Sequence, residues 1–340
     1  MRVPDPEETV FDEQTRDHAA APAPDSPVTQ VAGRVFREME KVLVGQHDLQ
    51  EALIVALLAR GHILLEGVPG TAKTLAVRAF AHLCRVSFAR IQFTPDLMPS
   101  DLVGTNVYNQ QKHLFELRKG PIFAGIVLAD EVNRTPPKTQ AALLEAMEER
   151  QATIDGVSHP LPDPFLVCAT QNPIEYEGTY PLPEAQLDRF MMKVLVTYPE
   201  LDDEVQILAR RQAGFDAADL ATAHLEPVIA PEDLPVLRGW VQAVTVTPAV
   251  QKYIVEIARA VRANRHAVLG PSPRASVTLM MAAKALAAVR GRDFVTPDDV
   301  KSLALPVLRH RIILKPESEI EGYSADRVLR SVLESVEVPR

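Results

Sequence analysis

A glycine-bearing loop lies between a short apolar run at residues 62–66 and a helical pattern that continues to Cys84. Its residues are Gly67, Val68, Pro69, Gly70, Thr71, Ala72, Lys73 and Thr74. Glycines let successive backbone N–H groups point at one anion, and a helix start adds partial positive charge. In this spacing Lys73 would reach the outer phosphates of a nucleotide, and the Thr74 hydroxyl would ligate Mg²⁺. The pattern predicts a nucleotide-binding loop.

Ala72 stands where the general pattern for such loops has glycine. A methyl group at this position requires a helical φ, which is acceptable if Ala72 already opens the helix. The alternative interpretation is a chance loop with a solvated lysine. The combination of strand, glycines, Lys-Thr pair and helix favours the nucleotide site.

Two adjacent carboxylates, Asp130 and Glu131, follow another apolar run at residues 126–129. They would lie at the carboxyl edge of the sheet, where open α/β sheets bind ligands. Asp130 would hold Mg²⁺ through water, and Glu131 would take a proton from the attacking water. An acidic pair after a strand is by itself more often a solvated turn. Together with the loop at 67–74, the pair indicates hydrolysis rather than binding alone.

The elements that must position these residues alternate between strand and helix. Apolar runs occur at residues 62–66, 87–93, 125–129, 165–170 and 190–196. Helical patterns separate them, which predicts an α/β fold with a five-stranded parallel sheet covered on both faces. Two inserted β-hairpins are expected, one within residues 102–123 and one formed by residues 152–154 with a partner near Val157.

Beyond Pro199 only helical patterns remain. They lie at residues 204–213, 231–242, 248–264, 273–290, 297–310 and 325–336. Three of them begin with proline just inside a polar capping residue, which is a strong signal for a helix start. We therefore expect an α/β nucleotide-binding domain over residues 29–222, followed by a smaller all-α lid domain over residues 223–340.

The composition is that of a globular protein. The 340 residues are 46% hydrophobic and 24% charged, with a formal net charge of −9, unlike disordered, collagen-like or membrane proteins. No apolar run approaches the roughly 18 residues needed to cross a bilayer. The two cysteines form no Cys-x-x-Cys pair, and the N-terminus has no signal-peptide pattern. We expect a cytoplasmic protein without membrane insertion.

The charge is spread unevenly along the chain. Residues 1–26 hold seven acidic and two basic side chains together with four prolines. Such a segment cannot bury enough apolar surface to offset its ordering entropy, so residues 1–28 are expected to form a disordered acidic arm. The rest of the chain carries no dense basic stripe, which makes nucleic acid an unexpected partner.

An ordered set of motifs resembles the MoxR family of AAA+ ATPases, within the clade that carries an insertion in helix 2. The motifs lie at residues 67–74, 90–104, 128–134, 169–173, 177–190 and 270–274. The resemblance covers about residues 30 to 335 and implies a AAA+ P-loop core followed by a helical lid. Alanine at position 72 fits this family, although it departs from the broader ATPase pattern.

The resemblance assigns further roles. Asn172 matches the sensor 1 position, where an amide orients the attacking water; the alternative interpretation is an Asn-Pro turn, which is common anywhere, and the context favours the functional one. Arg189 matches the arginine finger that enters a neighbouring subunit's nucleotide site, although an Asp-Arg pair is usually a surface ion pair. Arg274 matches sensor 2, which would couple closure of the helical domain to the γ-phosphate. Val44 and Gly45 match the segment lining the adenine pocket, but an ordinary helix end explains them nearly as well.

The implied activity is ATP hydrolysis, with ATP and Mg²⁺ bound at the interfaces of a homo-oligomeric ring, expected to be a hexamer. The ring would remodel or mature a client, in this family often a protein with a von Willebrand A (VWA) domain, in support of metal insertion or assembly. A magnesium-chelatase ATPase subunit and a nucleotide switch with little turnover stay open as alternatives. In the hairpin within residues 102–123, Tyr108, Leu114 and Phe115 could equally be packed or touch a substrate.

Overall fold

The computed structural model describes residues 26–172 and 180–339. Most of the predicted acidic arm, up to residue 25, lies outside the described residues. Residues 27 and 28, the last two of the predicted arm, are helical because they begin α1 (Pro27–Met39). Ser26 caps this helix, since its hydroxyl accepts a hydrogen bond from the Thr29 N–H. The predicted motifs at 169–173 and 177–190 also fall partly outside the described residues.

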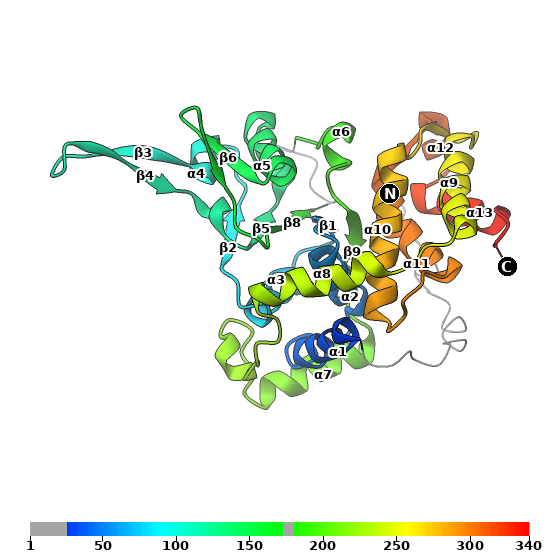
Figure 1. The fold of residues 1–340 in the computed structure, drawn as a ribbon, viewed down its shortest axis with the longest axis horizontal. Helices are drawn as coiled ribbons and strands as arrows, with labels where there is room; N and C mark the ends of the chain where they lie inside the picture. The colour runs from blue at the N-terminus through cyan, green and yellow to red at the C-terminus, as the bar shows by residue number, and fades with distance from the viewer. Residues whose placement is uncertain (1–25, 173–179, 340) are drawn as a thin grey trace.

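The five-stranded parallel sheet predicted from the sequence is confirmed (Figure 1). Its strand order is β2-β5-β8-β1-β9, and every neighbouring pair is parallel. The strands are β1 (Ile63–Glu66), β2 (Phe88–Gln92), β5 (Ile126–Asp130), β8 (Leu166–Gln171) and β9 (Met192–Leu195). All strands therefore end at one carboxyl edge and begin at one amino edge.

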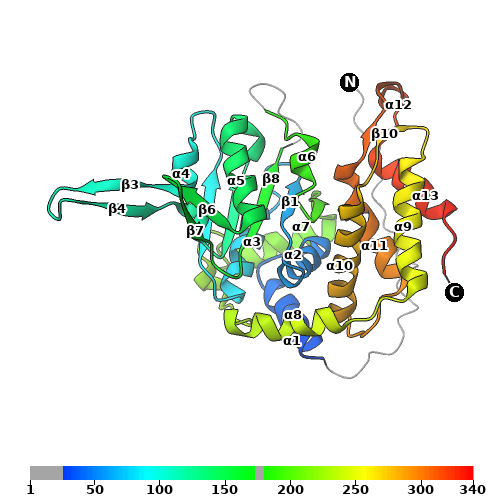
Figure 2. The same ribbon diagram turned by 45° about the horizontal axis from the view of Figure 1, so that its top comes forward.

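Alternate residues of the strands face two separate buried clusters, as the two-residue period of a strand requires. Ile63 and Leu65 belong to the cluster that contains α1, α2 (His47–Leu58) and α3 (Lys73–Leu83). Leu64 belongs to the other, with α4 (Pro99–Val103) and α5 (Pro137–Glu149). Helices thus cover both faces of the sheet (Figure 2), and the near-continuous apolar character of the strands follows from this double burial.

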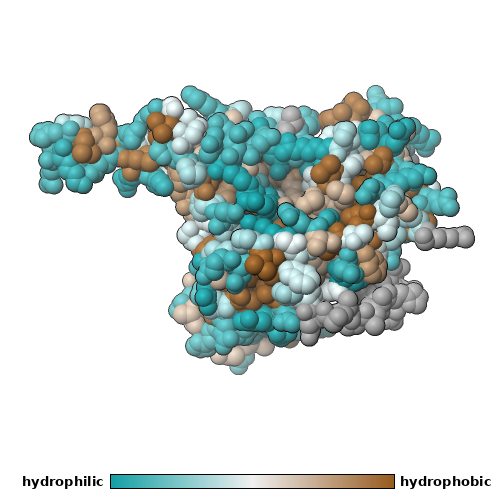
Figure 3. All heavy atoms as spheres, viewed as in Figure 1, coloured by the Kyte–Doolittle hydropathy of each residue, from teal (hydrophilic) through white to brown (hydrophobic). Residues whose placement is uncertain are grey.

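Both predicted hairpins are present: β3 (Gly104–Asn109) with β4 (Leu114–Lys119), and β6 (Gln151–Ile154) with β7 (Val157–Pro160). The first projects from the body of the molecule (Figure 1), and apolar side chains are visible along it (Figure 3). Tyr108, Leu114 and Phe115 are 47%, 46% and 69% exposed. They are therefore not packed into a core.

After β9 the chain is mainly helical, as predicted. The α-helices after β8 are α6 (Glu184–Leu187), α7 (Leu201–Gln212), α8 (Leu234–Ala243), α9 (Pro248–Arg262), α10 (Pro273–Val289), α11 (Pro297–Leu308), α12 (Pro316–Ile320) and α13 (Ala325–Ser335). Short 3-10 helices occupy Pro121–Phe123, Val132–Arg134, Leu220–Ala223, Pro231–Asp233 and Arg309–Arg311. Thr247, Ser272 and Thr296 cap α9, α10 and α11 with their hydroxyls. No helix among the described residues is long and apolar enough to span a bilayer.

The lid is not purely helical, because β10 (Ala267–Leu269) and β11 (Ile313–Leu314) form a small antiparallel ribbon. It also shares its core with the α/β part: buried residues of α1 and α2 join those of α8 to α11 and α13 in one cluster. Thr29 donates to the Ala288 carbonyl across this junction, and Arg290 pairs with Glu51 at 3.1 Å. The α/β part and the lid therefore pack as a continuous body.

His62 links three elements at the amino edge of the sheet. Its Nδ1 accepts the Val167 N–H of β8 at 3.0 Å, and its Nε2 lies 3.2 Å from the Met147 carbonyl of α5. Nδ1 must be unprotonated to accept, so the neutral ring is the form that fits. Complete burial lowers the pKa of His62 to about 4.

This burial predicts acid sensitivity of the fold. The unfolded chain takes up the His62 proton near its ordinary pKa of about 6.5, whereas the folded chain resists it until about 4. The stabilisation is therefore complete above pH 6.5 and is lost as the pH falls, by about 2 kcal/mol between pH 7 and pH 5. Denaturant unfolding across this range should show the loss. His62→Gln should weaken the dependence by this amount; a remainder is expected because burial also lowers the pKa of His310 well below its ordinary value. His113→Gln, at an exposed histidine, should leave the dependence unchanged.

Candidate active site

The predicted phosphate loop connects β1 to α3. A Cβ at Gly67 would collide with the Val196 carbonyl oxygen, so only glycine lets the end of β9 pack against the loop. Gly70 has φ +85°, a conformation that favours glycine. Lys73 folds back on the loop, and its Nζ donates to the Gly67 and Val68 carbonyls, both at 2.7 Å. The loop thus curls around the ammonium group that would meet a phosphate.

The predicted backbone of Ala72 is wrong. Ala72 does not open the helix with a helical φ; it precedes α3 as the capping residue in the left-handed region, at φ 59° and ψ 16°. The helix begins at Lys73. The turn into the helix needs this conformation, which is the physical reason that the broader pattern has glycine here.

Asp130, Glu131 and Asn172 lie at the same carboxyl edge as the loop. Asp130 ends β5, and Asn172 directly follows β8, the strand between β5 and β1. Burial lowers the pKa of the Lys73 ammonium, and the negative charges of Asp130 and Glu131 oppose that change. The structure therefore brings the lysine and the two carboxylates into one electrostatic environment.

Thr170 is a site residue that the sequence reasoning did not assign. It is 2% exposed, and its hydroxyl donates to Asp130 Oδ1 at 2.6 Å and accepts the Glu131 N–H at 2.8 Å. One hydroxyl thereby sets the positions of both acidic residues. The sequence feature that could have identified Thr170 is its position near the end of a strand, inside the motif at residues 169–173.

Two further residues from β2 hold the carboxylates from the other side. Arg90 donates from Nη2 to Asp130 Oδ2 at 2.6 Å, and Gln92 donates from Nε2 to Glu131 Oε2 at 2.7 Å. Arg134 adds an ion pair to Glu131 at 3.3 Å. Arg90 and Gln92 are two apart on a strand that ends at this edge, so they share one face. Their register against β5, with Gln92 opposite Asp130, is set by the tertiary structure and cannot be read from β2 alone.

The oxygen ligands that Thr74 and Asp130 offer fit Mg²⁺. The Thr74 hydroxyl and the Asp130 carboxylate offer the hard oxygens that Mg²⁺ prefers, and Mg²⁺ usually keeps several of its waters. When bound, the ion would neutralise charge on the nucleotide phosphates.

Arg189 and Arg274 lie at the opposite edge of the sheet. Arg189 precedes β9, and both arginines pair with Glu148 near the end of α5, at 3.0 Å and 3.1 Å. Glu148 follows Met147, whose carbonyl faces His62 at the start of β1. The two arginines therefore share one carboxylate at the amino edge.

The length of the strands separates these arginines from the phosphate loop of their own chain. β1 has four residues, and at about 3.3 Å per residue it spans roughly 13 Å. The structure brings Arg189 and Arg274 together with each other, and not with Lys73 or Glu131. This agrees with a finger that acts on a neighbour. The role of Arg274 in coupling closure of the helical domain to the γ-phosphate stays a prediction.

Val44 and Gly45 form the turn between α1 and α2. Val44 is 8% exposed, and a Cβ at Gly45, which has φ +65°, would collide with the Asp203 carboxylate of α7. The next residue, Gln46, donates to the Thr197 carbonyl just beyond β9. The chain from Val196 to Asp203 therefore contacts both this turn and the phosphate loop.

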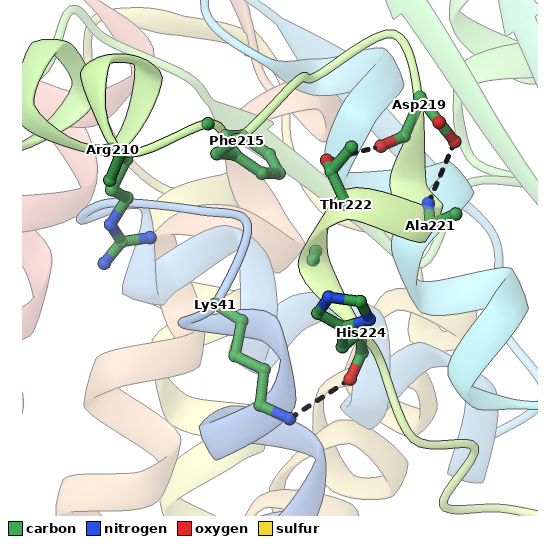
Figure 4. A pocket seen from close by; sticks show the side chains of 10 residues that line it. Lys41, Arg210, Phe215, Asp219, Ala221, Thr222 and His224 are labelled. Carbon is green, nitrogen blue, oxygen red and sulfur yellow. Dashed lines mark hydrogen bonds between the residues drawn. The ribbon is translucent and has the colours of Figure 1, made fainter.

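A hollow of about 680 Å³ lies beside the ends of α1 and α7 (Figure 4). Its polar groups are already engaged: Lys41 with Glu38, Arg210 with the Glu40 carbonyl, and Asp219 with the Ala221 N–H. None of the predicted site residues lines it. The candidate active site is therefore the edge of the sheet that bears the phosphate loop.

The fold and this edge define a P-loop ATPase of the AAA class. Residues 62–192 match the model for the ATPase family associated with various cellular activities (AAA), and residues 259–332 match the AAA lid domain. The chain belongs to the MoxR family of these ATPases.

Three similar proteins illustrate this relation. Chaperone MoxR1 of Mycobacterium tuberculosis is 42% identical over 95% of this chain and 89% of its own length. The uncharacterized protein YeaC of Bacillus subtilis is 49% identical over 90% of this chain and 94% of its own. The crystal structure of a Cytophaga hutchinsonii protein superposes with a TM-score of 0.85 at 43% identity, covering 92% of this chain and 96% of that chain.

The position of Thr170 predicts that its hydroxyl tunes the metal site. Thr170→Val keeps the shape but removes the hydrogen bonds to Asp130 and Glu131. The Mg²⁺ concentration for half-maximal ATPase should rise by about 10- to 100-fold, as for other residues that orient metal ligands. Thr170→Ser keeps the hydroxyl and should retain most of the affinity. Unchanged Mg²⁺ dependence in the valine variant would contradict this role.

The left-handed backbone of Ala72 predicts that glycine stabilises the loop. Ala72→Gly should raise the free energy of unfolding by up to about 1 kcal/mol, because it relieves the contact of Cβ with the backbone. The matched control is Ala76→Gly, inside α3, which should lower it by about 1 kcal/mol or more. Denaturant unfolding measures both. Equal losses in the two variants would show that Ala72 carries no strain.

Proposed function

We propose that this chain hydrolyses ATP at the interfaces of a homo-oligomeric ring and uses the cycle to remodel or mature a client protein. The observation that carries the proposal is the separation of the site into two halves. The phosphate loop and carboxylates lie at the carboxyl edge of the sheet, and Arg189 and Arg274 lie at the amino edge. A complete site forms when the amino edge of one copy meets the carboxyl edge of the next.

Within that composite site each residue has a defined task. The loop N–H groups and Lys73 bind the phosphates of ATP, while Thr74 and Asp130 hold Mg²⁺. Glu131, kept in place by Gln92 and the Thr170 hydroxyl, accepts the proton of the water that attacks the γ-phosphate. Asn172 orients that water from the end of β8.

The neighbour supplies positive charge for the transferring phosphate. Arg189 and Arg274 would both leave Glu148 and turn to the triphosphate, since a guanidinium binds carboxylate and phosphate in the same fork geometry. In the single chain Glu148 is half-exposed, as is Arg274, so exchange of partners needs little rearrangement of the core. Val44 and Gly45 would border the adenine.

The client is proposed from the family. The relative MoxR1 is named a chaperone, and the resemblance of the motifs implies a client that often carries a VWA domain. The projecting β3–β4 hairpin, with Tyr108 and Phe115 exposed, supports contact with another protein. We place this activity in the cytoplasm, in a ring of six copies.

Mixing of two inactive variants tests the composite site. Glu131→Gln removes the base and Arg189→Ala removes the finger, and each should lower turnover by at least about 100-fold. An equal mixture contains interfaces at which an intact Glu131 meets an intact Arg189. Their share in a head-to-tail ring is about a quarter, so the ATPase rate should recover toward a quarter of the wild-type rate.

The wild-type rate per subunit should rise with protein concentration, because isolated subunits lack the arginines of a neighbour. Arg34→Ala, at an exposed arginine on α1, is the matched control and should behave as the wild type. A fully active Arg189→Ala variant with turnover independent of concentration would refute the composite site. In a pull-down with Glu131→Gln and ATP, capture of DNA alone would refute the remodelling role.

A further inference from the structure

Helix α7 is amphipathic, but its apolar face points outward. None of its residues is buried. Leu201, Val205 and Leu208 are 77%, 57% and 71% exposed, and their spacing of four and three residues places them on one side of the helix. The side chains that face the body are Asp203, next to Gly45, and Arg210, which donates to the Glu40 carbonyl. The helix is thus attached by its polar side.

We propose that this apolar stripe of α7, formed by Leu201, Val205 and Leu208, is the docking surface for a second copy of the chain. The proposal rests on the composite site described above. It adds the surface by which one copy holds the other and the residues that form it. A helix that is attached through polar side chains and exposes three large apolar side chains is expected where another surface covers it.

The position of the stripe favours a neighbouring copy as the occupant. α7 begins five residues after Val196, whose carbonyl packs on Gly67 of the phosphate loop. A copy that delivers Arg189 and Arg274 to this loop must sit over the carboxyl edge of the sheet. Asp203 of α7 lies against Gly45, and the next residue, Gln46, contacts Thr197 just beyond β9, so the N-terminal end of the helix lies next to that edge.

The incoming face has matching apolar side chains. Val277 is three residues after Arg274 on α10 and is 56% exposed, and Val268 and Leu269 of β10 are 65% and 51% exposed. These residues flank Arg274 along the chain. A contact between them and the α7 stripe would bury apolar surface on both copies next to the nucleotide, in a heterologous, head-to-tail arrangement that can close into a ring.

The charges of the two faces are also complementary. The first turn of α7 carries Asp202 and Glu204, which are both exposed, besides Asp203, which faces Gly45. The amino edge that would approach it has a hollow of about 220 Å³ lined by five arginines and two carboxylates. Those residues are Arg60, Arg150, Arg189, Arg274, Arg311, Glu148 and Asp188. Opposite charges at the rim of an interface favour the correct orientation of the partners.

A double variant, Leu201→Ser with Leu208→Ser, tests the stripe in the full-length protein. ATPase rate and sedimentation with ATP are measured against protein concentration. The concentration at half-maximal rate should rise by at least about tenfold, as expected for loss of two apolar anchors. The plateau rate should be retained, because neither residue belongs to the site. The thermal midpoint of the subunit should not fall, because both side chains are already exposed.

The matched control is Val236→Ser with Val255→Ser, at exposed valines on α8 and α9 that are 61% and 44% exposed. This control should assemble at the wild-type concentration. If the wild-type rate depends on concentration but the α7 variant reaches half-maximal rate at the wild-type concentration, the proposal is overturned. A wild-type rate that is independent of concentration refutes the composite site itself, and the proposal with it.

Discussion

The direction of the parallel strands is the constraint on which the rest of this structure depends. All five strands end at one edge, so the loop after β1, the carboxylates after β5 and Asn172 after β8 must gather there. The same geometry sends Arg189, which precedes β9, to the other edge. The candidate binding and proton-accepting groups are thereby separated from the two arginines by the length of a strand. A MoxR-family chain built this way would hold the two halves of the proposed ATPase site at opposite edges of one sheet.

At the carboxyl edge the candidate catalytic carboxylates are held in place within the single chain. Asp130 is held by Arg90 and the Thr170 hydroxyl, and Glu131 by Gln92 and Arg134. These supporting groups come from β2 and β8, on either side of β5, so the sheet itself keeps the carboxylates in register. Fixed polar groups of this kind need little reorganisation at the moment of reaction. The strands therefore act as the rigid support of the site.

The amino edge differs from the carboxyl edge in how its charged groups are held. Glu148 neutralises both arginines there, and its own half-exposed position leaves the pair open to exchange for a phosphate. In the proposed assembly, the outward apolar stripe of α7 and the exposed Val268 and Val277, which flank Arg274 along the chain, would supply the contact that brings two edges together. Local chemistry and surface patterning thus point to the same head-to-tail association.

The sequence by itself determined the class of fold and the candidate nucleotide-binding residues that the structure places together at one edge of the sheet. A phosphate loop is a contiguous segment between strand and helix, and Asp130 and Glu131 follow a buried strand directly, so spacing along the chain is sufficient to find them. Thr170, Arg90 and Gln92 contribute through neighbouring strands, and such contacts depend on the strand order β2-β5-β8, which is not written in any one segment. The left-handed backbone of Ala72 and the β10–β11 ribbon likewise depend on the surrounding packing. Only the tertiary structure decided that Arg274 shares Glu148 with Arg189, because residues 148, 189 and 274 meet only when the lid is docked on the amino edge of the sheet.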